Sequence, residues 1–271
     1  TSKRSIQLNY SAPRLYLAAG ATTIRTTGSR DAYSELNLKK AIESGQAIGP
    51  RIFVTGPYIT GGTGFTTMTR VNSPEAARRV VAYWAEEGVS WFKAYTQISR
   101  AELGAAIDEA HKRGIKVTGH LCSVSYIEAV ELGIDNLEHG LFANTDYDPE
   151  KEPDKCPPGA IARLIDVDVN SEEVQKTFKA MIDNNVAMTS TLAVYEMYVP
   201  GRPPIEQRVL DAMSPEVRDE FLTTRKQIAE AAKNNRGFTI SEKLFKIAQA
   251  YELAFHRAGG LLASGVDPTG Y

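Results

Sequence analysis

Short apolar runs alternate along the chain with segments of helix length. Six times a helical segment ends at glycine or at an asparagine pair, and a run rich in β-branched residues follows, at residues 21–26, 89–95, 115–121, 134–140, 186–192 and 261–267. Glycine and asparagine suit the left-handed end of a helix, and such runs suit buried parallel strands. A seventh run, at residues 51–55, follows Gly49-Pro50 and a predicted helix over about 34–44. The pattern predicts seven parallel strands alternating with helices.

Alternation over this length is typical of a (β/α) barrel or a doubly wound sheet. None of the predicted helices opens with GxGxxG or with a Walker-type phosphate loop, which argues against a nucleotide-binding doubly wound sheet. The 271 residues, 42% of them hydrophobic, suffice for one large core. We therefore predict an α/β fold, a (β/α)8 TIM-type barrel, in which residues 1–271 form a single partial barrel with strands 2 to 8. Strand 1 is expected to precede Thr1.

Three long loops are predicted at the carboxyl end of the barrel, at residues 56–72, 142–170 and 195–240. In barrels, loops at this end build the substrate pocket. The third loop contains Ser214-Pro215-Glu216, a helix start signal followed by apolar residues at helical spacing. We expect this segment to act as a lid.

Composition excludes several partners and leaves the compartment open. A net charge of −2 gives no electrostatic reason to expect nucleic acid or an anionic membrane, and no apolar run reaches the roughly 20 residues that span a bilayer. Cys122 and Cys156 are too few for a disulfide framework and lack CxxC spacing. We interpret Cys122 as a small buried thiol. Cytoplasmic and exported locations both remain open, as does a homo-oligomer.

Four predicted strands end with a side chain that can bind a metal: Lys93, His120, His139 and Asp267. Carboxyl ends of parallel strands lie at one edge, so the two imidazoles are expected to share a focus that suits Zn, Mn, Co or Fe. Asp267 can bind the metal and take a proton from water, or it can cap the Asp-Pro-Thr-Gly turn. An unpaired buried Lys93 is costly, and an ion pair or a snorkelling side chain is its alternative.

The remaining polar residues near these positions are predicted to lie elsewhere. Strand alternation places Glu138 on the face opposite His139, so Glu138 is left out of the site. His111 and His256 fall within predicted helices and are interpreted as solvent-exposed.

The ordered motifs GATTIRTTG, GPRIFVTGPYITGGTG, WFKAY, KVTGHL, NLEHG and LASGVDP resemble those of the amidohydrolase superfamily. The resemblance covers nearly the whole chain and is strongest to the branch of imidazolonepropionase-like enzymes and metal-dependent Xaa-Pro dipeptidases (prolidases). It implies a barrel hydrolase with one or two divalent ions, zinc first, at its carboxyl end. Lys93 would carry a CO2-derived carbamate that bridges two metals, and His120 and His139 would be the strand-five and strand-six ligands. Asp267 would be the strand-eight ligand and general base, and Tyr95 would contact the substrate carbonyl or, equally, pack in the core.

The sequence departs from the family pattern at both ends and in one loop. The strand-one His-x-His motif has no counterpart, and the last helix and the small β-sandwich of the family are missing after Tyr271. We interpret the sequence as truncated at both ends, so that the fragment alone would lack two ligands. The loop GGTGFTTM also lacks the histidine that some relatives carry there.

Together these features predict a metal-dependent hydrolase that cleaves an amide, cyclic amide or dipeptide C–N bond in a small-molecule substrate. A metal-activated hydroxide would attack, with Asp267 as the general base. Two alternatives remain open: a lyase or isomerase that uses Lys93 as a Schiff-base amine, and an inactive barrel fragment.

Overall fold

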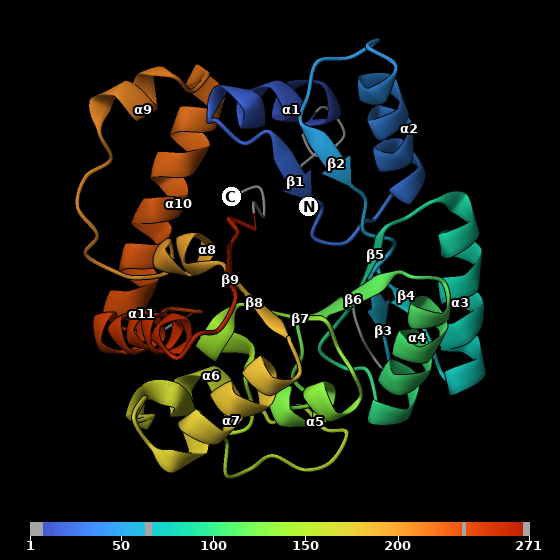
Figure 1. The fold of residues 1–271 in the computed structure, drawn as a ribbon. Coiled ribbons are helices and arrows are strands. Elements are labelled where there is room, and N and C mark those ends of the chain that lie inside the picture. Colours follow the sequence, from blue (N-terminus) through green and yellow to red (C-terminus); the bar gives the residue numbers. More distant parts are fainter. Residues whose placement is uncertain (1–7, 63–66, 235–236, 268–271) are drawn as a thin grey trace.

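The structure, a computed structural model, describes residues 8–62, 67–234 and 237–267. It is an α/β fold whose strands surround a common centre and whose helices lie outside them (Figure 1). Each of the seven predicted runs contains one strand: β1 (Thr23–Arg25), β2 (Arg51–Phe53), β5 (Trp91–Ala94), β6 (Lys116–Gly119), β7 (Asn136–Glu138), β8 (Ala187–Ser190) and β9 (Leu262–Ser264).

These seven strands are parallel and follow one another in chain order. β1 pairs with β2, and β5 to β9 pair successively, while a bridge between Thr55 and Trp91 links the end of β2 to β5. In the described part of the chain, β1 and β9 do not pair with each other, and each has one neighbour. The arrangement is consistent with the predicted TIM-type barrel.

The loop over residues 56–72 holds two short strands that the sequence pattern did not predict. β3 (Ile59–Thr60) lies parallel to β5 through Ile59 and Ala94, and β4 (Thr69–Arg70) lies parallel to β3. Strands of two residues are too short to show an alternation of polar and apolar positions. The chain passes so closely here that a Cβ atom on Gly61 would lie 2.5 Å from the carbonyl oxygen of Gln97. A side chain at position 61 would therefore push the loop away.

Serine side chains cap the starts of several helices. At five helix starts, a backbone N–H donates a hydrogen bond to the side chain of a serine: Ser73, Ser99, Ser125, Ser171 and Ser241. The eleven helices in the described residues are α1 (Leu8–Ala18), α2 (Ala32–Glu43), α3 (Pro74–Glu87), α4 (Arg100–Lys112), α5 (Tyr126–Glu131), α6 (Ala160–Arg163), α7 (Glu172–Asp183), α8 (Leu192–Glu196), α9 (Gln207–Asp211), α10 (Pro215–Lys233) and α11 (Glu242–Arg257). Two 3-10 turns, Gly140–Ala143 and Leu164–Asp166, complete them.

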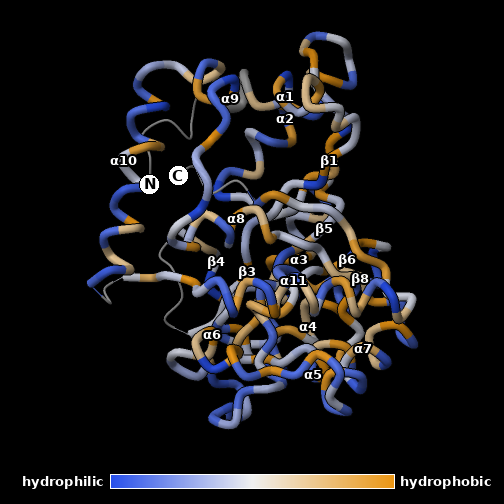
Figure 2. Tube along the Cα trace, turned by 90° about the vertical axis from the view of Figure 1, so that its left-hand side faces the viewer, coloured by the Kyte–Doolittle hydropathy of each residue, from blue (hydrophilic) through white to orange (hydrophobic). Residues whose placement is uncertain are grey.

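Two regions differ in how they are packed. Apolar residues gather where α3, α4, α5 and α7 cover the strands, whereas α10 is largely hydrophilic along its length (Figure 2). α10 begins at the Ser214-Pro215 signal as predicted, with Val217 donating its backbone N–H to Ser214, and none of its residues is buried. The helix is confirmed, and its role as a lid stays a prediction.

In the described residues, no helix is both long enough and apolar enough to cross a membrane.

Alternation along the central strands separates apolar from polar side chains. Phe92, Val117, Leu137 and Met188 occupy one face and are almost fully buried in the core. The residue that follows each of them along its strand is polar and buried and faces the inside of the barrel: Lys93, Thr118, Glu138 and Thr189. The apolar face thus holds the helices, while the interior is left for polar groups.

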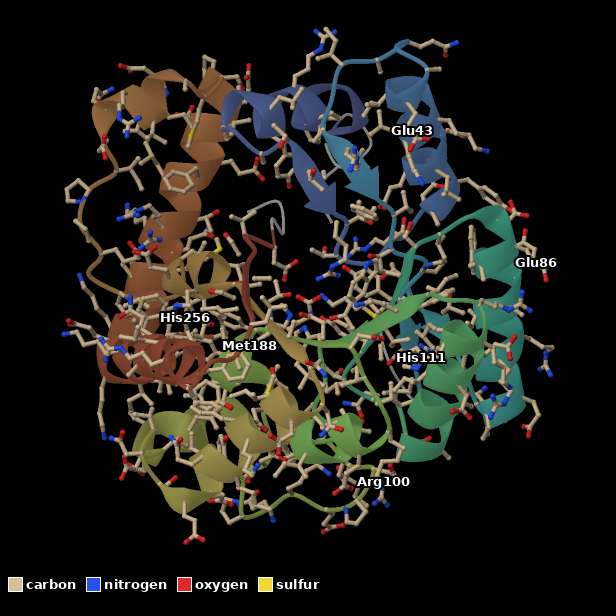
Figure 3. All side chains as sticks on the ribbon, viewed as in Figure 1. Glu43, Glu86, Arg100, His111, Met188 and His256 are labelled. Atoms are coloured by element: carbon tan, nitrogen blue, oxygen red, sulfur yellow. A yellow bond between two sulfur atoms is a disulfide. The ribbon has the colours of Figure 1, made fainter. Side chains whose placement is uncertain are left out.

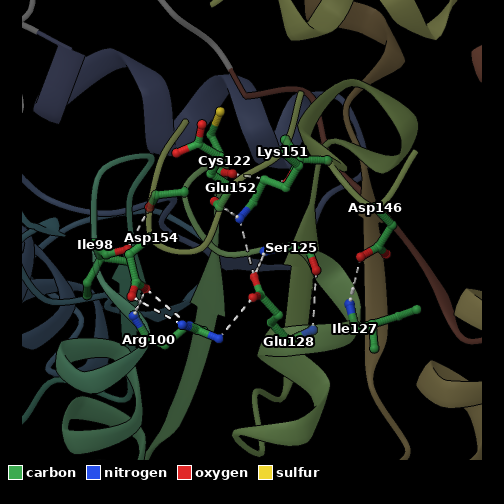
Figure 4. Close-up of polar contacts among 12 residues, drawn as sticks. Ile98, Arg100, Cys122, Ser125, Ile127, Glu128, Asp146, Lys151, Glu152 and Asp154 are labelled. Carbon is green, nitrogen blue, oxygen red and sulfur yellow. Dashed lines mark hydrogen bonds and ion pairs between the residues drawn. The ribbon is translucent and has the colours of Figure 1, made fainter. Parts of the chain in front are cut away.

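Cys122 and Cys156 form a disulfide, with their Cα atoms 4.9 Å apart. The interpretation of Cys122 as a free buried thiol was therefore wrong. The bond fastens the loop after β7 to the segment that follows β6, two residues beyond His120. A hydrogen bond and an ion pair hold the same loop: Asp154 accepts from the backbone N–H of Arg100 at 2.7 Å, and Lys151 lies 3.5 Å from Glu128 (Figure 4).

Reducing this disulfide is expected to lower the free energy of unfolding by about 3–4 kcal/mol, because the bond closes a loop of 34 residues in the unfolded chain. Thermal melts of the protein with and without reductant measure the effect. The double variant Cys122→Ala/Cys156→Ala is the control and should melt at the same temperature in both conditions. Two titratable thiols in the unreduced parent protein would show that the bond does not form.

Candidate metal centre at the carboxyl ends of the strands

The structure brings three of the four predicted metal ligands to one place. His120 follows β6 directly, His139 follows β7 directly, and their ring centroids lie 4.1 Å apart. Asp267 lies three residues beyond β9, with its Oδ2 atom 3.9 Å from Nε2 of His139. Lys93 lies inside β5, is 1% exposed, and has its Nζ atom 5.8 Å from the ring centre of Tyr58. Lys93 thus lies within its strand, whereas the other three residues follow theirs.

A backbone bend carries His139 into the site. His139 and Gly140 both adopt left-handed conformations, with φ angles of 74° and 55°. The buried hydroxyl of Tyr126 in α5 donates to the carbonyl oxygens of Glu138, at 2.6 Å, and Gly140, at 2.9 Å. Gly140 also has no room for a side chain, since a Cβ atom would lie 2.7 Å from Oε1 of Glu252. Strand alternation therefore ends at Glu138, and the bend sets the direction of the imidazole.

The two ring nitrogens of His139 have different surroundings. Nδ1 lies 2.7 Å from the hydroxyl oxygen of Thr191, whereas Nε2 is buried and has no hydrogen-bond partner in the described residues. The carboxylate oxygen of Asp267 at 3.9 Å is too far from Nε2 for a hydrogen bond. Nε2 is therefore the atom of this ring that is available to a ligand.

Electrostatics keep both imidazoles neutral. Burial, followed by the charges of His139 and Lys93, lowers the pKa of His120 well below its usual value. Burial and the charge of Lys93 do the same to the pKa of His139. A neutral imidazole offers a lone pair, which is the form that binds a metal ion.

Glu138 lies inside the barrel, so the prediction that it points away from the site was wrong. Its Oε1 atom accepts hydrogen bonds from Nη2 of Arg25 at 2.6 Å and from the hydroxyl of Thr118 at 2.8 Å. Asn136 donates to Thr118 at 2.7 Å and accepts from Thr189 at 3.1 Å. Burial alone raises the pKa of Glu138, but the charges of Lys93 and Arg25 bring it below its usual value. These residues form a polar layer that connects β1, β6, β7 and β8.

Tyrosines line the site beside the histidines. Tyr95 packs 4.7 Å from the ring of His120, and Tyr195, which the sequence analysis did not select, lies 5.8 Å from the ring of His139. Burial raises the pKa of Tyr58 to about 12, and burial together with the charge of Asp267 raises the pKa of Tyr95. The hydroxyl groups of Tyr58 and Tyr95 thus stay protonated near neutral pH and can donate hydrogen bonds.

The donor atoms fit a divalent metal ion, although the described residues do not contain a complete ligand set. In the described ranges, no group of three or more His, Cys, Asp or Glu side chains is arranged to hold a metal ion. The unpartnered Nε2 of His139, the neutral imidazole of His120 and the carboxylate of Asp267 nevertheless supply the nitrogen and oxygen donors that zinc and similar ions prefer.

The remaining two histidines are exposed on helices, as predicted. His111 is on the outer surface of α4, where its Nε2 atom lies 2.9 Å from Asp135, and His256 is exposed on α11 (Figure 3).

Comparison with known proteins agrees with the fold. Residues 16–146 match the model of the amidohydrolase family. No curated protein sequence matches the chain. A bottromycin amidohydrolase has a TM-score of 0.62 at 16% identity, over 94% of this chain and 56% of that one. A Xaa-Pro dipeptidase with bound methionine has 0.58 at 18%, over 98% and 60%. An ochratoxinase from A. niger has 0.57 at 15%, over 96% and 55%. The chain thus spans little more than half of each solved protein.

Proposed function

Because the family match and the solved structures support membership of the amidohydrolase superfamily, we propose that this chain is part of a metal-dependent hydrolase. Its substrate would be a small molecule with an amide, cyclic amide or dipeptide C–N bond. One observation carries the proposal: two neutral imidazoles at adjacent strand ends meet a carboxylate, and the buried Nε2 atom of His139 has no hydrogen-bond partner.

His120, His139 and Asp267 are the residues that would hold the ion. A divalent ion at this place would polarise a substrate carbonyl and lower the pKa of a water molecule. Zinc suits the nitrogen and oxygen donors best, and manganese, cobalt and iron are compatible with them. Lys93, carboxylated by CO2, would add an oxygen donor for a second ion and would remove a buried ammonium group.

The chain's own residues have distinct parts in the reaction. Asp267, whose side chain is 19% exposed, would accept a proton from the attacking water and deliver it to the leaving nitrogen. The hydroxyl of Tyr95, held beside His120, would donate a hydrogen bond to the substrate carbonyl oxygen as negative charge develops there. Because both histidines are buried and their pKa values are lowered, they would not take up the proton that Asp267 transfers to the substrate.

Elemental analysis and hydrolysis assays on the longest protein that the gene encodes test the proposal. We expect near-stoichiometric zinc, manganese, cobalt or iron, and hydrolysis of dipeptides, N-acyl amino acids or cyclic amides that stops with a chelator and returns with metal. Activity that persists without metal would overturn the proposal, and a borohydride-trapped substrate adduct on Lys93 would point to Schiff-base chemistry instead. If the protein contains no metal and hydrolyses none of these substrates, the remaining interpretation is a barrel without catalytic activity.

A further inference from the structure

Thr191 is a buried residue beside the candidate centre to which the proposed reaction assigns no part. It follows the last residue of β8, Ser190, and is 1% exposed. Its hydroxyl oxygen lies 2.7 Å from Nδ1 of His139, and both groups are buried. A single hydrogen bond therefore joins the end of β8 to the ring that follows β7.

We propose that Thr191 is a positioning residue that accepts the Nδ1 proton of His139 and so fixes the imidazole in the tautomer whose bare Nε2 faces the site. This inference rests on the proposed function, since it explains how one of the metal-binding nitrogens is kept available. Metal-binding histidines generally donate their second ring N–H to a neighbouring group, which sets both the tautomer and the ring orientation.

The direction of this hydrogen bond follows from the surroundings of Nε2. A neutral imidazole carries one proton, on Nδ1 or on Nε2. A proton on Nε2 would be a buried donor without an acceptor, because the nearest carboxylate oxygen, on Asp267, is 3.9 Å away. A proton on Nδ1 has an acceptor at 2.7 Å. The bare Nε2 is then left for a cation.

The surroundings also restrict how Thr191 and His139 can rotate. The hydroxyl of Tyr126 holds the carbonyl groups on both sides of His139, so the backbone places the ring and Thr191 sets its rotation. A Cβ atom on Gly265 would lie 3.5 Å from Cγ2 of Thr191, so the chain that leads to Asp267 passes directly against this side chain. As a β-branched residue, threonine has few rotamers to choose from. Thr191 thus contacts both the ring and the segment that carries Asp267.

The test measures two properties of the parent and of each variant. Nitrogen NMR spectra of the metal-free protein report the tautomers of the histidine rings, and competition with a chromophoric chelator reports the affinity for zinc. In the parent we expect His139 to carry its proton on Nδ1. Thr191→Val, which removes the hydroxyl at nearly constant shape, should lose this single tautomer and bind zinc about 10- to 100-fold more weakly. Thr191→Ser should keep both properties close to those of the parent.

Thr189→Val is the matched control, because it removes a buried hydroxyl in β8, two residues before Thr191, and this hydroxyl bonds Asn136 and not His139. It should leave the signal of His139 unchanged. A parent ring protonated on Nε2 would overturn the inference without any variant, and so would a Thr191→Val protein with parental spectrum and affinity. A parent that shows the Nδ1 tautomer but binds no metal would support the role of Thr191 and reject the proposed function.

Discussion

Replacing His139 with alanine is expected to remove most of the bound metal and to reduce the rate of hydrolysis strongly. The reduction should far exceed the roughly 10- to 100-fold loss that is typical when a residue that hydrogen-bonds a metal ligand is replaced. The reason is geometric. Nε2 of His139 is the buried nitrogen without a partner in the described residues. The ring of His139 lies 4.1 Å from the ring of His120, and its Nε2 atom lies 3.9 Å from the carboxylate of Asp267. Without this imidazole, only His120 and Asp267 remain as metal donors at this place. His120→Ala should have a similar effect on metal content.

Metal analysis after dialysis, followed by turnover at saturating metal, separates binding from chemistry. His256→Ala is the control, because His256 is exposed on α11 (Figure 3), and it should keep the parental metal content and rate. Asp267→Asn should retain part of the metal and lose turnover by about 10²- to 10⁴-fold, as expected for a general base. If His139→Ala and His120→Ala both bind metal as tightly as the parent, the centre lies elsewhere.

The strand order could be predicted because buried parallel strands leave a clear pattern. Six of the seven runs follow a glycine or an asparagine that ends a helix, the seventh follows Gly49-Pro50, and the structure places a strand in all seven runs. Parallel pairing then brings the ends of β6 and β7 together, and with them His120 and His139. β3 and β4 could not be predicted, because their pairing depends on how the loop folds back over β5.

The orientation of individual side chains depended on contacts that sequence spacing does not reveal. Glu138 was assigned to the wrong face because His139 was treated as part of the strand, whereas its left-handed backbone ends the alternation. Asn136, two residues before Glu138 in the same strand, does share its face, as alternation requires. The partner of Glu138, Arg25, lies 113 residues away, and only the closed arrangement of strands brings them together.

The disulfide was missed for a similar reason. Two cysteines that lie 34 residues apart and outside any motif carry no signal of pairing until the loop after β7 returns to the end of β6. The bond also bears on the compartment, which composition left open, because such bonds persist in oxidising environments. Its formation in the native protein would favour export.

Replacing Glu138 with glutamine is expected to destabilise the fold by about 3–5 kcal/mol, the usual cost of removing one partner from a buried ion pair. Glu138 is 1% exposed, and its Oε1 atom bonds Arg25 and Thr118. The variant keeps the shape of the side chain but leaves the guanidinium of Arg25 without its counter-charge. Nη1 of Arg25 lacks a hydrogen-bond partner in the described residues of the parent as well, so the loss of the charge is what the variant adds. Denaturant unfolding of the parent and the variant measures the difference.

The control is Glu43→Gln, because Glu43 is 59% exposed on α2 and lies 3.9 Å from Lys39, one helical turn away (Figure 3). That surface pair is expected to contribute less than about 0.5 kcal/mol. A double variant, Arg25→Met with Glu138→Leu, should recover part of the stability lost in Glu138→Gln. The guanidinium of Arg25 is then no longer left without its counter-charge, whereas the buried Lys93 still lacks the charge of Glu138. A loss below about 1 kcal/mol for Glu138→Gln would mean that the pair across the barrel is not formed, and that the polar layer beneath the histidines does not hold β1 against β7.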